Sequence, residues 1–389
     1  MHYDVGDYAS PQAALDAAEF DPCAIVEFPP ALYSLAAPLV VHSETTVRAY
    51  GAQFVAEGQH RLLRAFRDGD SFAGYDGPHD ITILGGTWDA QGQLAAPGTV
   101  VNAMNFCHAR DITVMDATIR NVAGAHAIEL SAVDGAVVER CRFEGFHNTG
   151  NRDYSESVQI GAPYSTATTD IGTWDATPCR RVSIVGCRMG PSVALGPFGA
   201  IAGDHVRAAN VYHDGIRVID CDVDGSLRFG IRPYAWRDFA VRGNTIRGTA
   251  GASIIVQHCR GGVVEGNVIR NAGSNAVNVS ASRGVVVGGN VVNDTATNYG
   301  IWVGTEDGEG SEDVLVAVNG VRGGAAGAAK LGVGVTGSAL MGNMLRRGSG
   351  GSTGIIAAAG PGTANRCEDN DFDGFTTNIS NGSGTIATE

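Results

Sequence analysis

Short runs of apolar, mostly β-branched residues recur along the second half of the chain. Each run is followed by a turn residue and then by another apolar residue, as in FAVRGNTI, VVEGNVI, VVVGGNVV, LVAVNGV, ALMGNML and CEDNDF. The turn residues are Asn244, Asn267, Asn290, Asn319, Asn343 and Asn370, at spacings of 23, 23, 29, 24 and 27 residues. Almost no helical periodicity lies between them. A repeat of this length built from short strands is typical of one coil of a β-solenoid.

The turn residues are expected to form a column through the solenoid. Coils stack at about 4.8 Å, so equivalent residues lie above one another, and an asparagine at a tight turn can hydrogen-bond to its neighbour in the next coil. In earlier coils cysteine takes this place, at Cys141, Cys187 and Cys221. Because a small, soft side chain suits a dry interior, we interpret most of the eight cysteines as stacked thiols rather than disulfides or zinc ligands.

Composition favours one domain of many short strands joined by tight turns. Glycine contributes 55 residues, the apolar fraction is 44% and the charged fraction is 17%, which excludes a disordered or collagen-like chain. The net charge of −14 argues against nucleic acid and anionic membranes as partners. No segment approaches the ~18–20 apolar residues of a membrane span. We expect a single domain over 1–389, with 1–50 as the N-terminal cap and first coil.

The first residues, MHYDVGDYAS, lack a basic region followed by an apolar run, so no signal peptide is visible. We still expect a secreted, extracellular protein. A signal peptide already removed and a cytoplasmic location are both left open at this point.

The opening VGDYASPQAALDAAEF, followed by AIVEFPPALYSLAAPLVVHSETTVRAYG, resembles the start of pectate-lyase-like, right-handed parallel β-helix proteins. HDITILGGTWDAQG is similar to an early-coil phrase of that class, which also includes polygalacturonases and phage tailspikes. The resemblance covers essentially the whole chain. It implies an all-β fold, a single-stranded right-handed parallel β-helix of about 11 coils with a capping helix after Ser10, and a bacterial source. The reaction does not follow, because the class includes hydrolases, lyases, epimerases and non-catalytic spikes.

The best-known catalytic signatures of that class do not transfer to this sequence. Polygalacturonases carry an Asn-x-Asp, an Asp-Asp pair and a His-Gly on successive coils, and this chain contains no Asp-Asp and no His-Gly. The clustered aspartates and basic residue of metal-dependent pectate lyases are not evident either. The site must therefore be argued from the residues themselves.

An outward-facing column of unusual residues is expected on one strand of each coil. Twelve residues before the turn residue lies the middle of a strand whose I-x-V alternation points x outward. Charged, amide and aromatic residues gather there, where a neutral face would carry Thr, Ser and Val. The column contains Glu129, Gln159, Ala202, Arg232, Ile255, Asn278 and Trp302, and the next outward position adds Asp204, Tyr234, Gln257 and Ser280.

Insertions fall beside this column. The intervals Cys141–Cys187 and Cys187–Cys221 are 46 and 34 residues, and extra residues lie at 147–155, 162–178 and 203–214. Long loops on a rigid solenoid usually form the walls of a binding groove. We therefore assign 147–214 to inserted groove loops. The charged stretch RDYSESVQIGAP, 152–163, is expected where a wall loop meets the column.

The candidate residues follow from this placement. Hydrolysis of a glycosidic bond needs two carboxyl groups, one acting as acid and one as nucleophile or base, and a nearby arginine can separate their pKa values. The catalytic candidates are Glu156, Asp153, Asp204 and His205. The substrate-binding candidates are Glu129, Gln159, His213, Asp214, Arg232, Tyr234, Trp236, Gln257 and His258.

Several candidates also have purely structural interpretations. Asp153 could be a turn residue, Glu156 could pair with Arg152 or Arg142, and Arg232 could neutralise Glu129. The histidines could be ordinary surface residues and the aromatic side chains could serve packing. These residues are His205, His213, Tyr234 and Trp236.

Two acidic segments are weaker candidates. DCDVDG, with Asp220, Asp222, Asp224 and Gly225, imitates the start of a calcium loop, but Ile231 stands where the bidentate glutamate belongs. TEDGEGSED, 305–313, is expected to be a solvated edge, with a metal site as the lesser alternative. No cofactor or metal is therefore expected, and calcium is the minor alternative.

The leading prediction is a carbohydrate-active enzyme, a glycoside hydrolase that cleaves a polysaccharide or oligosaccharide with a carboxylate pair. A polysaccharide lyase or epimerase acting on a uronate-containing glycan is the runner-up, since residues 226–264 hold six arginines against one acid and β-elimination needs a positive group and a base. A non-catalytic glycan-binding solenoid is the third alternative. The protein is expected to be a monomer or a homo-trimer.

Overall fold

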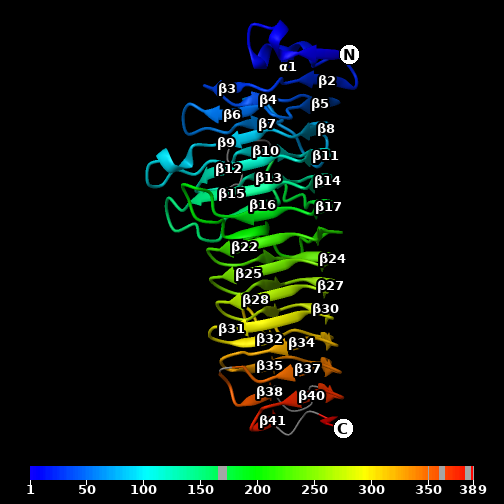
Figure 1. Ribbon diagram of the computed structural model, residues 1–389. Coiled ribbons are helices and arrows are strands. Elements are labelled where there is room, and N and C mark those ends of the chain that lie inside the picture. Colours follow the sequence, from blue (N-terminus) through cyan, green and yellow to red (C-terminus); the bar gives the residue numbers. More distant parts are fainter. Residues whose placement is uncertain (165–172, 349, 359–363, 382–386, 389) are drawn as a thin grey trace. The chain divides into compact units, whose positions relative to one another are not determined.

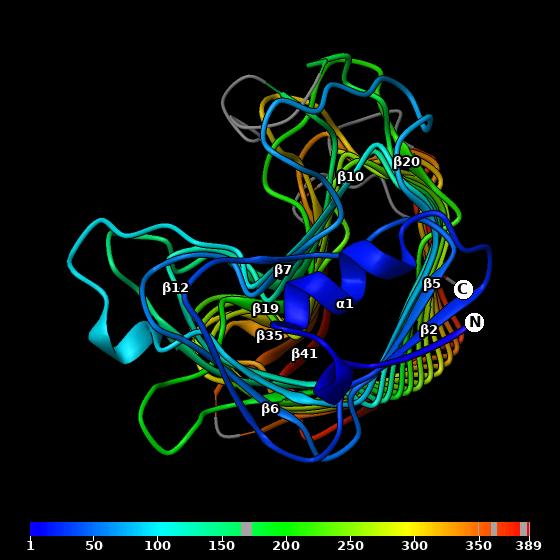
Figure 2. The same cartoon turned by 90° about the horizontal axis from the view of Figure 1, so that it is seen from above.

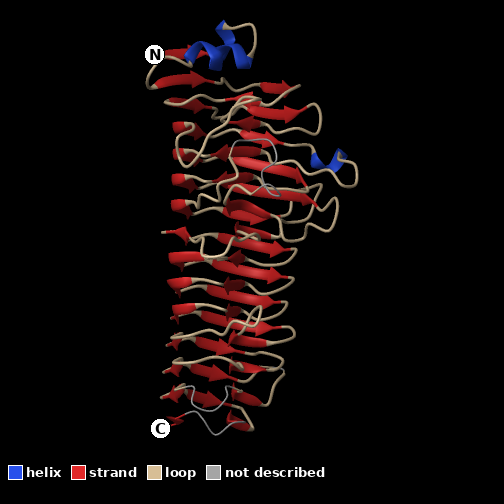
Figure 3. Cartoon of the chain, turned by 180° about the vertical axis from the view of Figure 1, so that it is seen from behind, coloured by secondary structure: helices blue, strands red, loops and turns tan. Residues whose placement is uncertain are grey.

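The computed structural model describes residues 1–164, 173–348, 350–358, 364–381 and 387–388. The chain contains two compact units, Met1–Asp214 and Gly215–Glu389, and the prediction of a single domain stays a prediction. Short strands make up nearly all the regular structure of both units (Figures 1 and 3). In each unit the chain visits three parallel sheets in turn, named here A, B and C.

In the first unit, the helices η1 (Val5–Asp7) and α1 (Pro11–Ala18) follow the first strand, and η2 (Gly92–Leu94) lies on a later loop. Its sheet A contains β1 (His2–Asp4), β2 (Ala24–Glu27), β5 (Thr45–Arg48), β8 (His79–Leu84), β11 (Arg110–Met115), β14 (Asp134–Glu139), β17 (Arg180–Val185) and β20 (His213–Asp214). Sheet B contains β3 (Leu32–Leu35), β6 (Gln53–Ala56), β9 (Thr87–Asp89), β12 (Thr118–Ala123), β15 (Arg142–His147) and β18 (Arg188–Gly190). Sheet C contains β4 (Leu39–Val40), β7 (Leu63–Arg64), β10 (Met104–Cys107), β13 (Ile128–Ser131), β16 (Glu156–Gly161) and β19 (Ala200–Gly203).

The second unit repeats the same order of sheets. Its sheet A contains β21 (Arg217–Ile219), β24 (Trp236–Arg242), β27 (Arg260–Glu265), β30 (Arg283–Gly288), β33 (Leu315–Ala317), β36 (Ala339–Met341), β39 (Arg366–Glu368) and β42 (Ala387–Thr388). Sheet B contains β22 (Asp222–Ser226), β25 (Thr245–Thr249), β28 (Val268–Ala272), β31 (Val291–Thr295), β34 (Gly320–Arg322), β37 (Met344–Arg346) and β40 (Asp371–Asp373). Sheet C contains β23 (Ile231–Arg232), β26 (Ile254–Gln257), β29 (Val277–Ser280), β32 (Tyr299–Gly304), β35 (Gly327–Leu331), β38 (Thr353–Ala357) and β41 (Thr377–Asn381).

The core of each unit is a stack of inward-facing apolar columns. In the first unit, Ile83 of β8, Val114 of β11 and Val138 of β14 are consecutive backbone partners, and each is at most 1% exposed. Full burial of such a side chain stabilises the folded state by about 1.5–3 kcal/mol relative to leaving it exposed. The alternation of apolar and polar residues within each short strand therefore sets which face points inward. These observations confirm the predicted parallel β-solenoid.

The asparagine column is confirmed within the second unit. Nδ2 of Asn267 donates to Oδ1 of Asn290 at 2.9 Å and to the carbonyl of Val241 at 3.0 Å. The same arrangement repeats for Asn244, Asn290, Asn319 and Asn343. The eight cysteines form no disulfide in the described residues, and all except Cys23 are buried, as the interpretation of stacked thiols requires.

The predicted capping helix begins where expected and closes one end of the first unit. Oγ of Ser10 accepts a hydrogen bond from the main-chain N–H of Ala13, and Pro11 occupies the first turn of α1. Figure 2 shows α1 lying across the end of the first coils. The side chain of Gln12 bonds both the N–H and the carbonyl of Val40 in β4, so the cap satisfies the exposed edge of sheet C.

No helix in the described ranges is long and apolar enough to cross a membrane. Of the predicted insertion 162–178, residues 165–172 lie outside the described residues.

Candidate active site

The predicted outward column is present on sheet C of the first unit, with one change of register. Asn105, Glu129, Gln159 and Gly203 are consecutive backbone partners on β10, β13, β16 and β19. The assignment of Ala202 to this column is wrong. Ala202 pairs with Val158 and is fully buried, because a register error of one residue turns a side chain to the opposite face.

The column is not an open groove floor, as the sequence suggested. Glu129 and Gln159 each expose only 5% of their surface. Oε2 of Glu129 accepts hydrogen bonds from the side-chain amides of Asn102 and Asn105. Nε2 of Gln159 lies 3.3 Å from Oδ1 of Asp204. The polar groups of the column therefore bind one another and the loops above them.

A second row of residues lies three positions before this column, and it contains His126, which the sequence did not reveal. The register of β13 and β16 places His126 level with Glu156, and that of β10 and β13 places Asn102 level with His126. Oδ1 of Asn102 accepts the main-chain N–H of His126 at 3.0 Å, and Nδ1 of His126 lies 2.9 Å from the carbonyl oxygen of Glu156. The alternation that selected Glu129 and Gln159 assigns His126, three residues before Glu129, to the opposite face, so it could not have found this residue.

Glu156 lies at the centre of this cluster and is fully buried. Nδ1 of His205 is 3.1 Å from its Oε2 atom, and Nδ1 of His126 is 3.6 Å from the same oxygen. The two imidazole rings are stacked with centroids 5.6 Å apart. His205 exposes 16% of its side chain, so it is the member of the group that solvent or a ligand can reach.

The charged stretch before β16 brings two further groups to His205. The ring of Tyr154 lies 4.6 Å from the His205 ring, and the Arg152 guanidinium lies 5.4 Å from the Tyr154 ring. Nε of Arg152 is buried and has no hydrogen-bond partner within the described residues. Asp153 is half-buried, and its carbonyl approaches Gly199 so closely that a Cβ there would collide with it. This loop places the Tyr154 ring against His205 and the Arg152 guanidinium beside that ring.

Asp204 is a buried acceptor rather than an exposed acid. Its Oδ1 accepts the main-chain N–H groups of His205 at 2.6 Å and Val206 at 3.1 Å, and its Oδ2 lies 3.1 Å from Nε2 of His213. Asp204 and His213 expose 1% and 2% of their surfaces. Asp214 continues into β20, where it pairs with Arg180 of sheet A. The structure therefore separates Asp214 from the sheet C cluster and uses Asp204 to hold the loop that carries His205.

Burial determines the charge state of His126. Loss of solvation lowers its pKa to about 4, although the negative charge of Glu156 acts in the opposite direction. His126 is therefore neutral at neutral pH. A neutral imidazole stacked beside His205 adds no repulsion against a proton on that ring.

The remaining candidates lie in the second unit and are described there by themselves. Nε of Arg232 donates to Oε1 of Gln257 at 3.1 Å, and its guanidinium lies 4.8 Å from the ring of Tyr234 and 5.3 Å from that of Phe229. His258 is 3% exposed and lies edge-on to Tyr234. Four of the five candidates in this unit thus form one polar cluster on sheet C.

Trp236, the fifth, is wrongly assigned. Its side chain is fully buried, because Ala235 turns the chain with a φ of 53° and Trp236 begins β24 of sheet A facing inward. The acidic segment 305–313 is also more than a solvated edge. Glu306 accepts hydrogen bonds from Gln257 and Ser280 at 2.8 and 3.1 Å, and Asp307 and Glu309 lie 3.3 and 3.4 Å from the His258 ring nitrogens.

Among the described residues, two groups of side chains are close enough to hold a cation. The ligand atoms of His126, Glu156 and His205 lie within 4.8 Å of one another, as do those of the exposed group Glu44, His79 and Asp80. In the segment that imitates a calcium loop, Asp222 and Asp224 instead bind Arg247 at 3.0 and 3.2 Å. Their carboxylates therefore serve an ion pair between neighbouring strands.

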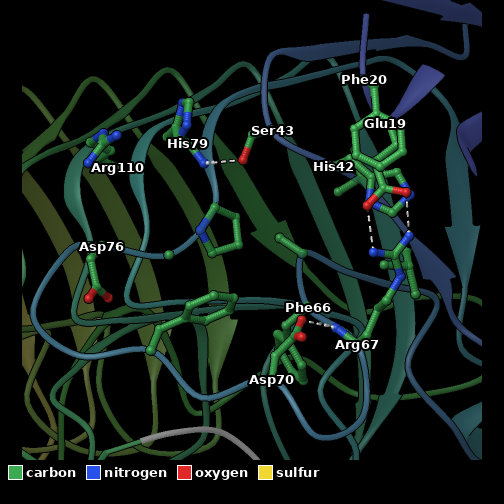
Figure 4. Close-up of a pocket in the computed structure, with 16 residues that line it drawn as sticks. Glu19, Phe20, His42, Ser43, Phe66, Arg67, Asp70, Asp76, His79 and Arg110 are labelled. Atoms are coloured by element: carbon green, nitrogen blue, oxygen red, sulfur yellow. Dashed lines mark hydrogen bonds and ion pairs between the residues drawn. The ribbon is translucent and has the colours of Figure 1, made fainter.

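A cavity of about 450 Å³ lies elsewhere in the first unit, beside the cap (Figure 4). Arg67 binds both carboxylate oxygens of Glu19 there, at 2.6 and 2.7 Å, and its main-chain N–H donates to Asp70. None of the predicted site residues lines this cavity. Arg67 and Glu19 already bind each other in this cavity. The cavity is therefore separate from the histidine and carboxylate cluster that we consider as the reaction centre.

Comparisons with known proteins agree with this architecture. A family model described as a right handed beta helix region matches residues 201–315. The chain is a right-handed parallel β-helix. The structure of PfbA, a surface adhesin of Streptococcus pneumoniae, aligns over 100% of both chains with a TM-score of 0.74 and 16% identity.

The β-helix is also similar to other proteins of this fold. The Family 28 exopolygalacturonase of Yersinia enterocolitica aligns with 100% of this chain and 78% of its own, with a TM-score of 0.60 and 10% identity. In sequence, the plasmin and fibronectin-binding protein A of Streptococcus pneumoniae is 25% identical over 42% of this chain. The match spans only 25% of that protein's length. At these identities the comparisons show the fold and leave the reaction to be argued from the site.

Proposed function

We propose that the protein is a carbohydrate-active enzyme that cleaves an acidic glycan by proton transfer at the Glu156–His205 pair. The observation that carries this proposal is the hydrogen bond between Nδ1 of His205 and the buried Oε2 of Glu156. A carboxylate in this position orients the imidazole and stabilises the imidazolium that forms when the opposite nitrogen, Nε2, accepts a proton. His205 is partly exposed, as a group that touches substrate must be.

The groups around His205 favour β-elimination over hydrolysis. In this reaction Nε2 of His205 removes the proton from the carbon next to a uronate carboxylate, and the C–O bond to the leaving sugar breaks as a C=C bond forms. The Tyr154 hydroxyl gives its proton to the leaving oxygen. Arg152, held over the Tyr154 ring, neutralises the uronate carboxylate and thereby acidifies the adjacent C–H bond. The stretch RDYSE thus supplies a cation, an acid and the carboxylate behind the base.

A glycoside hydrolase is the second candidate, because four carboxylates gather in this part of the chain. Retaining or inverting hydrolysis needs one carboxyl group that carries a proton and a second that reaches the sugar. Oε2 of Glu129 accepts from two amides, and Asp204 accepts from main-chain N–H groups and His213, so these oxygens are already engaged in hydrogen bonds within the protein. This arrangement suits a supporting role better than that of a general acid.

The proteins of similar fold agree with a glycan partner outside the cell. One is named as an exopolygalacturonase and another as a surface adhesin. We propose an extracellular or cell-surface location and a polysaccharide or oligosaccharide substrate. An activity assay distinguishes such an enzyme from a protein that binds glycans without turning them over.

The test is Glu156→Gln, with Glu57→Gln at an exposed position as the matched control. Wild type is first screened on acidic and neutral polysaccharides for absorbance near 235 nm, roughly where unsaturated uronates absorb, and for new reducing ends. Because glutamine keeps the shape but removes the negative charge, we expect turnover to fall about 100-fold or more with an unchanged melting temperature. Full activity in Glu156→Gln would contradict the proposal. New reducing ends without absorbance near 235 nm would show that the protein is a glycoside hydrolase rather than a lyase.

A further inference from the structure

The cluster of His126, Glu156 and His205 has a property that proton transfer does not use. Two imidazole nitrogens face one carboxylate oxygen, at 3.6 and 3.1 Å from Oε2 of Glu156, and one ligand atom from each of the three residues lies within 4.8 Å of the other two. Ligands that share a metal at about 2.0–2.2 Å are separated by roughly 3–3.5 Å. Both distances to Oε2 of Glu156 are close to this separation, so a small shift would bring the three groups to the spacing of ligands of a single ion.

The surroundings of these atoms suit a bound cation. Glu156 is fully buried and His126 is 4% exposed, whereas His205 exposes 16% of its side chain. Two imidazoles and one carboxylate are ligands typical of zinc and its neighbours in the transition series, in contrast to the all-oxygen sites of calcium and magnesium. Three protein ligands with one accessible side leave a position for water or another small ligand.

The hydrogen bonds behind the ligand-bearing segments point the same way. The main-chain N–H of His126 is fixed by Oδ1 of Asn102 at 3.0 Å. The main-chain N–H of His205 is fixed by Oδ1 of Asp204 at 2.6 Å. Both ligand-bearing segments are thus held in place before an ion arrives.

We propose that His126, Glu156 and His205 form a binding site for one divalent transition-metal ion of the zinc type. Nδ1 of each histidine and Oε2 of Glu156 are the ligands. Each imidazole carries its proton on Nε2 in the bound form, and the bond from His126 to the carbonyl of Glu156 is replaced by the bond to the ion. Binding does not depend on the proposed reaction. One consequence rests on that reaction: with Nε2 of His205 protonated, the Glu156–His205 pair cannot accept a proton, so the ion inhibits turnover.

The experiment measures binding of the metal alone. Zinc chloride is titrated into the full chain by calorimetry in a non-chelating buffer, and cobalt(II) is added separately to record its visible absorption. The variants are His126→Ala and His205→Ala, each checked by circular dichroism for native strand content. His79→Ala is the matched control, because it removes the histidine of the exposed Glu44, His79 and Asp80 group.

We expect one ion per chain for wild type and for His79→Ala, with binding weakened at least ~10-fold in folded His126→Ala and His205→Ala. Absence of zinc binding, undiminished binding in both cluster variants, or loss of binding in His79→Ala would each overturn the proposal. A variant that fails to fold is replaced by the corresponding glutamine variant. Turnover with and without zinc is measured separately. If zinc binds at the cluster and turnover continues unchanged, the metal site stands and the assignment of the Glu156–His205 pair to catalysis is wrong.

Discussion

Nε2 of His213 donates a hydrogen bond to Oδ2 of Asp204, 3.1 Å away, in a fully buried contact. The direction is fixed because Nδ1 of His213 accepts the main-chain N–H of Cys179 at 3.0 Å. The neutral ring therefore carries its proton on Nε2. This pair joins the start of the 203–214 loop to its end, and the same carboxylate positions the backbone of His205.

Asp204→Asn should therefore loosen this loop. The amide nitrogen of asparagine would face a donor, either His213 or the main-chain N–H groups of His205 and Val206, and one buried group would lose its partner. We expect a loss of about 3 kcal/mol in the free energy of unfolding, measured by urea unfolding, with faster proteolysis within 203–214. Asp224→Asn, which breaks an exposed ion pair with Arg247, should cost less than about 1 kcal/mol. Equal effects of the two variants would contradict the role given to Asp204.

Asn267→Leu should disrupt the asparagine column of the second unit. Oδ1 of Asn267 accepts from the main-chain N–H and the side chain of Asn244, and its Nδ2 donates to Val241 and Asn290. Leucine removes all these bonds and leaves buried donors and acceptors without partners. We expect a loss of about 3–5 kcal/mol in the free energy of unfolding, measured by thermal and urea unfolding.

Asn293→Leu is the matched control for the asparagine column, because Asn293 is only half-buried in β31. It should change the melting temperature little. An unchanged melting temperature in Asn267→Leu would show that the column does not contribute to stability.

The buried cysteines should make the protein sensitive to alkali. Burial raises the pKa of Cys179 and of Cys259 to about 12, from an ordinary value of 9.0. Between these values the unfolded chain releases protons that the folded chain retains, so the free energy of unfolding falls as pH rises from 9 toward 12. The slope is at most about 1.4 kcal/mol per pH unit for each such thiol. Urea unfolding between pH 8 and 10.5 measures it, and Cys179→Ala should make the decline shallower.

Thiol labelling provides the control for that measurement. At pH 8 the native protein should react rapidly at Cys23, the exposed cysteine, and all eight thiols should react in denaturant. Rapid labelling of several thiols in the native state would mean that the buried cysteines are accessible and that their pKa values are not raised.

The repeating part of the fold was predictable because one physical requirement recurs in every coil. A buried polar turn residue such as Asn290 needs an equivalent partner above and below it, so its spacing in the sequence reports the length of a coil. The same spacing also predicted the outward positions of Glu129 and Gln159. At Ala202 the predicted position was wrong by one residue, because an inserted loop has no fixed length and packing sets the register after it.

The chemistry of the site was only partly predictable. Glu156 and His205 were selected as candidates from charge and insertion. Their contact depends on how the 203–214 loop folds back, and the hydrogen bonds of Asp204 hold that loop. His126 was missed because it lies an odd number of residues before Glu129, where strand alternation assigns it to the opposite face from the outward column. Trp236 was assigned to the surface because a single turn residue, Ala235, moves the chain from sheet C to sheet A.

Tyr154→Phe tests the proposed reaction most directly. Phenylalanine keeps the ring that contacts His205 and supports the Arg152 guanidinium, so the loop and the melting temperature should be unchanged. The variant lacks the hydroxyl that would protonate the leaving oxygen in β-elimination, so turnover followed near 235 nm should fall about 100-fold. Tyr8→Phe, at a half-buried position beside Tyr3 in the cap, should have no effect on turnover. If Tyr154→Phe retains full activity while Glu156→Gln loses it, the acid in the reaction is not Tyr154 but one of the carboxyl groups, with Asp153 on the same loop the first to be replaced.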